Sequence, residues 1–148
     1  MVFRGFDEDE ESILFCTDRR SQKYDELIQK SSVELCWYFL KSREQYRLRG
    51  VAHFVQQEQI IQQIWSALSP AGKAQFFGPT PGEQMTHNSG EADSTHHDHL
   101  EYSPHFVVIK LSFHFVDYLS LASSQEGFQQ RFICQFTQNR WESYEVYP

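Results

Sequence analysis

The chain has 148 residues, of which 40% are hydrophobic and 16% aromatic, which is enough for one globular domain with its own core. The formal net charge of −7 argues against a general nucleic-acid binder, because attraction to phosphates requires a basic surface. No stretch approaches the roughly 18 apolar residues of a membrane-spanning helix. We therefore expect a globular protein that binds neither nucleic acid nor membrane.

The three cysteines, Cys16, Cys36 and Cys134, lie in apolar runs and lack the CxxC or CxxH spacing of zinc sites. Such cysteines are typical of buried, reduced thiols in a reducing compartment. The first residues do not form a signal peptide, since five consecutive acidic residues occupy positions 7–11. We expect a cytoplasmic protein, with an organelle-targeting peptide upstream of Met1 as the alternative.

The first elements along the chain are two short strands and a helix. Residues 1–6 read as the end of a strand and a turn, and residues 12–17 as a second strand. Ser21 is the predicted N-cap of the helix that follows. The apolar stripe of that helix consists of Tyr24, Leu27 and Ile28.

A hairpin of two strands, residues 33–40 and 45–56, comes next. In its second strand Gln45, Arg47 and Arg49 project to one face, while Tyr46 and Leu48 project to the other. An amide beside two guanidinium groups is costly to desolvate, so an anionic or polar group, or water, is expected against them. The alternative is a solvated face with surface ion pairs.

Two helices and four strands complete the chain. Helices are predicted over residues 58–67 and from Ser69-Pro70 to about residue 77. Residues 83–104 are polar and predict a flexible loop within a single domain over residues 1–148. Strands are predicted over residues 105–113, 115–121, 128–136 and 141–146. The excess of strands predicts a mainly β (α+β) fold, an antiparallel barrel or sandwich with a few peripheral helices.

The polar loop is rich in potential metal ligands. These are His87, His96, His97, His99, Glu91, Asp93 and Asp98. A flexible loop lacks the supporting hydrogen bonds that orient the ligands of a metal site. We therefore expect no metal site there, only solvation or adventitious binding.

An ordered set of short segments resembles the pyridoxamine 5'-phosphate oxidase-like family. The segments are VFRGF at 2–6, CTD at 16–18, RSQK at 20–23, CWYF at 36–39, REQYR at 43–47, and the closing Trp141 and Pro148. Within the family, the chain resembles more specifically the cyanobacterial and plant subgroup, in which CWYF, REQFR and LS…F..P.PG segments recur. It covers residues 1–148 and implies an antiparallel split β-barrel that homodimerises and holds flavin mononucleotide (FMN) at the dimer interface.

The resemblance also implies which residues hold FMN. The strand of Val2, Phe3 and Arg4 would lie along the flavin, with Cys16 and Thr17 beside it. Ser21, Gln22 and Lys23 would grip the phosphate, Gln45 would meet the ring, and an arginine near the C-terminus would be Arg131. A helix N-terminus with a hydroxyl and a cation is suited to a phosphate dianion, and an amide offers the ring both a donor and an acceptor.

The chain also departs from the family pattern. Gln22 replaces an arginine of the phosphate grip, and Gly127-Phe128-Gln129 stands where the oxidase proper has a substrate-binding Arg-Leu-His segment. The first barrel strands would precede Met1. Oxidation of pyridoxamine phosphate is therefore not expected, and the catalytic residues and substrate stay open. Three functions remain: an FMN-dependent oxidoreductase on another small molecule, a non-catalytic flavin- or haem-binding module, or a truncated form that binds no cofactor.

Overall fold

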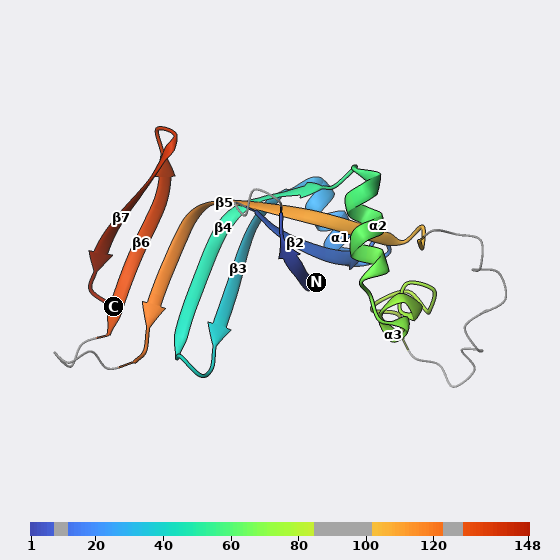
Figure 1. Ribbon diagram of the computed structural model, residues 1–148, viewed down its shortest axis with the longest axis horizontal. Helices are drawn as coiled ribbons and strands as arrows, with labels where there is room; N and C mark the ends of the chain where they lie inside the picture. The colour runs from blue at the N-terminus through green and yellow to red at the C-terminus, as the bar shows by residue number, and fades with distance from the viewer. Residues whose placement is uncertain (8–11, 85–101, 123–128) are drawn as a thin grey trace. The chain divides into compact units, whose positions relative to one another are not determined.

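The computed structural model describes residues 1–7, 12–84, 102–122 and 129–148. By its internal contacts the chain divides into two compact units. Unit 1 consists of Met1–Ser31 and His53–Leu111, and unit 2 of Ser32–Ala52 and Ser112–Pro148. Figure 1 shows the elements along the chain, among which strands β4 and β5 run from one unit into the other.

Unit 1 combines strands with all three helices of the described chain. Its complete elements are β1 (Val2–Phe6), β2 (Ser12–Asp18), α1 (Gln22–Gln29), α2 (Glu58–Ser66) and α3 (Pro70–Ala74). Strand β2 pairs antiparallel with β1 and also neighbours β5, and all its residues are buried. The core centres on Trp65, Phe76 and Phe106, whose ring centroids lie 5.0–5.8 Å apart.

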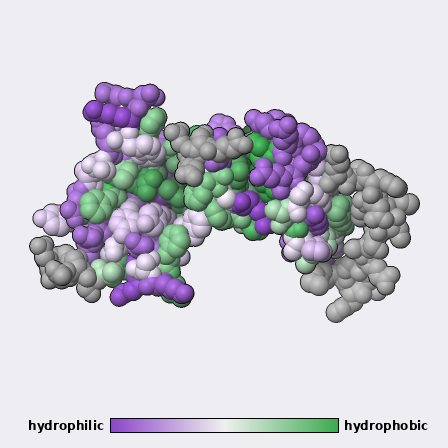
Figure 2. All heavy atoms as spheres, viewed as in Figure 1, coloured by the Kyte–Doolittle hydropathy of each residue, from purple (hydrophilic) through white to green (hydrophobic). Residues whose placement is uncertain are grey.

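Unit 2 is a sheet without a helix among its described residues. Its strands are β3 (Ser32–Phe39), most of β4 (Glu44–Phe54), the second half of β5 (Phe106–Ser120), β6 (Gln130–Thr137) and β7 (Arg140–Val146). The β3–β4, β5–β6 and β6–β7 pairs are antiparallel. Aromatic residues line one face, with centroids of neighbouring rings 5.0–6.2 Å apart: Trp37, Phe39, Tyr46, Tyr118 and Phe132. Over these strands Figure 2 shows apolar residues interspersed with polar ones at the surface.

Most predicted elements are confirmed to within two residues, and the mainly antiparallel β class with few helices is confirmed. One strand prediction is wrong, because residues 105–113 and 115–121 form one continuous strand, β5. The helix predicted to about residue 77 ends at Ala74. Residues 85–101 of the predicted loop lie outside the described residues. None of the described helices is long and apolar enough to cross a membrane.

Two burial predictions are also wrong. Ile28, expected in the apolar stripe of α1, is 60% exposed, while Leu27 is buried as expected. All three thiols are free, but only Cys16 is buried, whereas Cys36 is exposed and Cys134 half-buried. Cys36 and Cys134 are not buried because they lie in strands of unit 2, which carry few buried side chains.

Gly50 of β4 provides a test of how closely the strands of unit 2 approach each other. A Cβ at Gly50 would lie 2.1 Å from the carbonyl oxygen of Ser112 on β5. We expect Gly50→Ala to lower the free energy of unfolding by on the order of 3 kcal/mol, because backbone atoms must separate. The matched control is Gly78→Ala, whose Cβ would meet nothing closer than 3.8 Å. Urea denaturation of both variants checks this, and equal stabilities would contradict it.

Candidate functional site

Six of the ten residues predicted to hold the cofactor line one pocket of unit 1. This pocket, of about 230 Å³, lies between β1, the end of β2, the start of α1, and α3 with the turn after it. The six residues are Val2, Arg4, Cys16, Thr17, Ser21 and Lys23. We call it the β1–α1 pocket. Met1 and Asp18 also line it, and residues that are distant in sequence complete its wall: Gly72, Gln75, Phe76 and Pro81.

The start of α1 supplies the polar side of the pocket. Strand β2 ends at Asp18, and Ser21 is the N-cap of α1, as predicted. The Ser21 hydroxyl does not cap the helix; it donates to the carbonyl oxygen of Asp18 at 2.6 Å. The first backbone N–H groups of a helix have no acceptor within the helix, so this end of α1 favours an anion. Lys23, in the first turn, adds a positive charge.

The floor of the pocket joins β1 to β2. Arg4 donates from Nε to the Sγ of Cys16 at 3.1 Å, and Cys16 is only 2% exposed. The hydroxyl of Thr17 lies 3.4 Å from that of Ser21. A thiol is a weak acceptor and occupies one of the five guanidinium donors. The described contacts of Arg4 therefore leave donors for a bound group.

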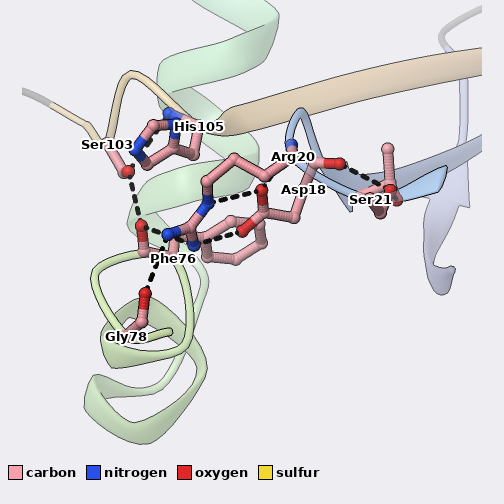
Figure 3. A network of polar contacts seen from close by, with 8 residues as sticks. Asp18, Arg20, Ser21, Phe76, Gly78, Ser103 and His105 are labelled. Atoms are coloured by element: carbon pink, nitrogen blue, oxygen red, sulfur yellow. Dashed lines mark hydrogen bonds and ion pairs between the residues drawn. The ribbon is translucent and has the colours of Figure 1, made fainter. Parts of the chain in front are cut away.

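Asp18, which also lines the pocket, and Arg20, which does not, form a polar network (Figure 3). Arg20 donates to the Asp18 carboxylate from Nε at 3.0 Å, from Nη2 at 2.7 Å and from its backbone N–H at 2.8 Å. Its guanidinium also donates to the carbonyl oxygens of Gly78 at 2.8 Å and Phe76 at 3.5 Å. The buried Ser103 hydroxyl donates to the same Phe76 oxygen at 3.0 Å.

This network sets the charge of Asp18. Burial alone would raise the pKa of its carboxyl, but the hydrogen bonds from the Arg20 side chain and backbone outweigh it and lower the pKa below its usual value. The side chain of Asp18 is 9% exposed and that of Arg20 21%. The pair is thus largely shielded from water and charged at neutral pH.

The other four predicted cofactor residues lie elsewhere. The Phe3 ring packs against Phe6 and Phe15, and the exposed Gln22 side chain donates to Glu26 at 2.8 Å. Gln45 and Arg131 belong to unit 2. Arg131 makes a two-pronged ion pair with the buried Asp117, at 2.8 and 2.9 Å. The hydrogen bonds from Arg131 lower the pKa of Asp117.

The cationic face of β4 has its anion within the chain. Glu34 of β3 accepts from Arg47 at 2.5 Å and from Arg49 at 2.8 Å, as the β3–β4 register places these residues opposite or diagonally opposite each other. Arg49 also lies over the Phe115 ring, 4.6 Å from its centroid. The alternative of a solvated face with surface ion pairs therefore describes Arg47 and Arg49, which are both exposed.

No group of three or more potential metal ligands occurs among the residues that the structure describes. The histidine-rich stretch falls in residues 85–101, outside them.

The comparisons with known proteins identify the family. A family model described as "Pyridoxamine 5'-phosphate oxidase, FMN-binding domain" matches residues 1–56. A crystal structure of a pyridoxamine 5'-phosphate oxidase-related, FMN-binding protein from Nostoc punctiforme is 33% identical, with a TM-score of 0.87, over all of this chain and 79% of that one. The chain belongs to the pyridoxamine 5'-phosphate oxidase-related family of FMN-binding proteins. The family resemblance and the split-barrel fold are confirmed, and FMN is the cofactor of this family.

Two further relatives delimit what the family membership tells us. Pyridoxine/pyridoxamine 5'-phosphate oxidase 2 of Arabidopsis thaliana is 28% identical over 155 residues, covering all of this chain and 78% of that protein. The crystal structure of PhzG from Burkholderia lata, in complex with tetrahydrophenazine-1-carboxylic acid, has a TM-score of 0.78. It is 20% identical over 99% of this chain and 72% of that one, and this likeness concerns the fold alone.

Sequence reasoning missed Arg20 and the wall after α3 as parts of this site. Arg20 is part of the RSQK segment that carries the family resemblance, but only Ser21, Gln22 and Lys23 of that segment are assigned to the phosphate grip. The Asp18–Arg20 spacing could have indicated a local ion pair. The carbonyl groups that accept hydrogen bonds from Arg20, however, lie 56 and 58 residues away in sequence, and no local pattern reveals them.

The Asp18–Arg20 pair makes a prediction about stability. We expect Asp18→Asn to lower the free energy of unfolding at pH 7 by on the order of 3 kcal/mol, because it leaves a shielded guanidinium without its counter-charge. Asp25→Asn, at an exposed carboxyl of α1, is the control and should cost less than about 1 kcal/mol.

The direction of the pKa shift of Asp18 determines how this difference in stability changes with pH. The pKa of Asp18 lies below its usual value of 3.8 in the folded chain, so its contribution is complete above that pH and is lost as pH falls through the lowered folded value. The difference between wild type and Asp18→Asn should shrink below pH 3.8 in urea denaturation. A difference independent of pH would contradict the role of the carboxylate.

Proposed function

We propose that this chain is a flavoprotein that binds the phosphate of FMN in the β1–α1 pocket. The observation that carries the proposal is the presence in one pocket of Arg4, Thr17, Ser21 and Lys23. Two cations, two hydroxyls and a helix N-terminus together fit a phosphate dianion, and the Asp18 carboxylate that also lines the pocket is already paired with Arg20. Residues that the family resemblance suggested separately therefore share one chemically suitable site.

Each of these residues has a distinct part in holding the phosphate. Lys23 acts as a point charge, and the first-turn N–H groups of α1 donate along the helix axis. The Ser21 hydroxyl has to rotate, because it now donates to the Asp18 carbonyl. Arg4 stays on the floor of the pocket through Cys16 and offers its remaining donors to the cofactor.

For the flavin ring we propose Gln45 and Arg131, the two cofactor residues in unit 2. The Gln45 amide would face the carbonyl and N–H edge of the ring, which needs both a donor and an acceptor. Arg131 uses Nε and Nη2 in its ion pair with Asp117, and its remaining donors would face the ring. When bound, FMN supplies hydride and electron transfer, so the proposed activity is that of an oxidoreductase on a small substrate of unknown identity.

We also propose that the protein is a cytoplasmic homodimer. Val2, Phe3 and Phe6 of β1 are 37–58% exposed, more apolar surface than a short edge strand usually leaves in water. Three free cysteines suit a reducing compartment. Light scattering of the purified protein should give twice the chain mass of 17.5 kDa, and a monomer at micromolar concentration would contradict the dimer.

A non-catalytic flavin carrier is the second candidate. It is favoured by Gly127-Phe128-Gln129 in the place of the Arg-Leu-His segment of the oxidase proper. Anaerobic mixing with pyridoxamine 5'-phosphate and other amines separates the two candidates. Bleaching of the flavin absorbance by one of these compounds, with recovery in air, supports the oxidoreductase; no bleaching by any of them supports the carrier.

Lys23 tests the phosphate site directly. We expect Lys23→Gln to weaken FMN binding by about tenfold, the equivalent of one charge-assisted hydrogen bond, and to leave riboflavin binding unchanged because riboflavin has no phosphate. The matched control is Lys30→Gln, at the exposed C-cap of the same helix, which should bind both flavins like wild type. Quenching of flavin fluorescence measures the dissociation constants of FMN and of riboflavin. An equal loss for both flavins in Lys23→Gln would contradict the assignment, and so would wild-type protein that retains no FMN.

A further inference from the structure

Arg20 has the charge and the chain position of a phosphate ligand but not the geometry of one. It precedes Ser21 in the turn that leads into α1, yet its side chain is not among those that line the β1–α1 pocket. Figure 3 shows its guanidinium pointing toward the segment after α3, with the Asp18 carboxylate alongside. An arginine adjacent in sequence to the proposed phosphate site therefore does not line that site.

The donors of Arg20 are almost fully used by acceptors of the chain itself. All three guanidinium nitrogens donate: Nε and Nη2 to Asp18, Nη1 to Gly78, and Nη2 also to Phe76. A guanidinium has five N–H groups, and four hydrogen bonds are made here. One N–H group therefore remains, and a two-pronged contact with a phosphate would break the pair and leave Asp18 shielded from water with an uncompensated charge.

The acceptors that Arg20 selects lie next to the pocket wall. Gln75, Phe76 and Pro81 line the β1–α1 pocket, and Arg20 holds the carbonyls of Phe76 and Gly78 within this stretch. Ser103, which is fully buried, donates to the Phe76 carbonyl from the segment just before β5. The wall is thus fixed through its backbone by two side chains from different parts of unit 1.

We propose that Arg20 is a positioning residue of the flavin site, which with Asp18 holds residues 75–81 as a wall against the bound cofactor without touching its phosphate. This inference rests on the proposed function, since it assigns the pocket to FMN. Arg20 and Lys23, three residues apart, then have separable effects. Lys23 recognises the phosphate, whereas Arg20 sets how closely the pocket encloses whatever part of the flavin lies against residues 75–81.

The two roles differ in the ratio of FMN to riboflavin affinity. We expect Arg20→Lys, which keeps the charge but loses the two-pronged geometry, to weaken both flavins by the same factor of about ten. The ratio of the two affinities and its dependence on salt should stay as in wild type. In Lys23→Gln the ratio should fall, and its salt dependence should weaken because a screened charge pair has been removed. Fluorescence titrations at low and high potassium chloride measure the affinity ratio and its salt dependence in both variants.

A second readout separates positioning from loss of stability. At saturating FMN, acrylamide should quench the bound flavin more strongly in Arg20→Lys than in wild type, by about twofold, because a loosened wall admits solvent. A variant that is only less stable but binds in the same way would show wild-type quenching once saturated. Loss of FMN affinity alone, with riboflavin unaffected, would overturn the proposal in favour of a phosphate ligand. Wild-type affinities and wild-type quenching together would overturn it in favour of a surface ion pair.

The positioning role can also be measured without flavin. In the apo protein, hydrogen exchange of the amides in residues 76–82 should be faster in Arg20→Lys than in wild type, with the amides of α2 unchanged. Unchanged exchange in residues 76–82 would refute the proposal even if FMN binds. If wild type binds no FMN while the exchange rates differ, the proposed function fails and Arg20 remains only a brace of the fold. Should Arg20→Lys not fold, Ser103→Ala removes the other support of the Phe76 carbonyl and should give the same changes to a smaller degree.

Discussion

The ion pair between Asp18 and Arg20 is the interaction on which the arrangement of the site depends. It joins the end of β2 to the turn before α1, and through the Phe76 and Gly78 carbonyls to the segment after α3. The main-chain carbonyl of Asp18 also accepts the Ser21 hydroxyl. Asp18 therefore holds the hydroxyl at the helix start through its main-chain carbonyl and, through its carboxylate and Arg20, the wall after α3.

The pairing of charges differs between the cations of this pocket and most other arginines of this acidic protein. The chain carries a formal net charge of −7, and most of the guanidinium groups around its sheets are matched by carboxylates. Asp18, Glu34 and Asp117 pair with Arg20, Arg47 and Arg131 respectively. Arg4, by contrast, meets a thiol, and Lys23 lines the pocket at a helix N-terminus. The proposed binding of a phosphate dianion would therefore depend on local rather than global electrostatics.

The sequence predicts most of the fold because hydrophobic periodicity and turn residues are local signals. Such local signals predicted strand β2, the Ser21 N-cap and the alternation of β4. Burial could not be predicted from local patterns where it depends on another layer of secondary structure packing against the strand. Cys36 belongs to an apolar run, yet it is exposed, because unit 2 has no helix among its described residues. The split of β5 at residue 114 was wrong because an exposed histidine within a strand resembles a break.

The candidate site divides in the same manner. Cys16, Thr17, Ser21 and Lys23 lie close together in sequence, so short segments pointed to them and the structure brings them into one pocket with Arg4. The role of Arg20 depends on carbonyls more than fifty residues away, and backbone acceptors leave no trace in side-chain patterns. Gln45 and Arg131 are in the other unit, and their part in holding the ring stays a prediction.

A crystal structure of this chain grown with FMN tests the account most directly. The account predicts the phosphate within hydrogen-bonding distance of Lys23 and the start of α1, with Arg20 still paired to Asp18 and directed at the Phe76 and Gly78 carbonyls. A phosphate bound to Arg20 itself, or to the arginines of β4, with the β1–α1 pocket empty, would contradict it.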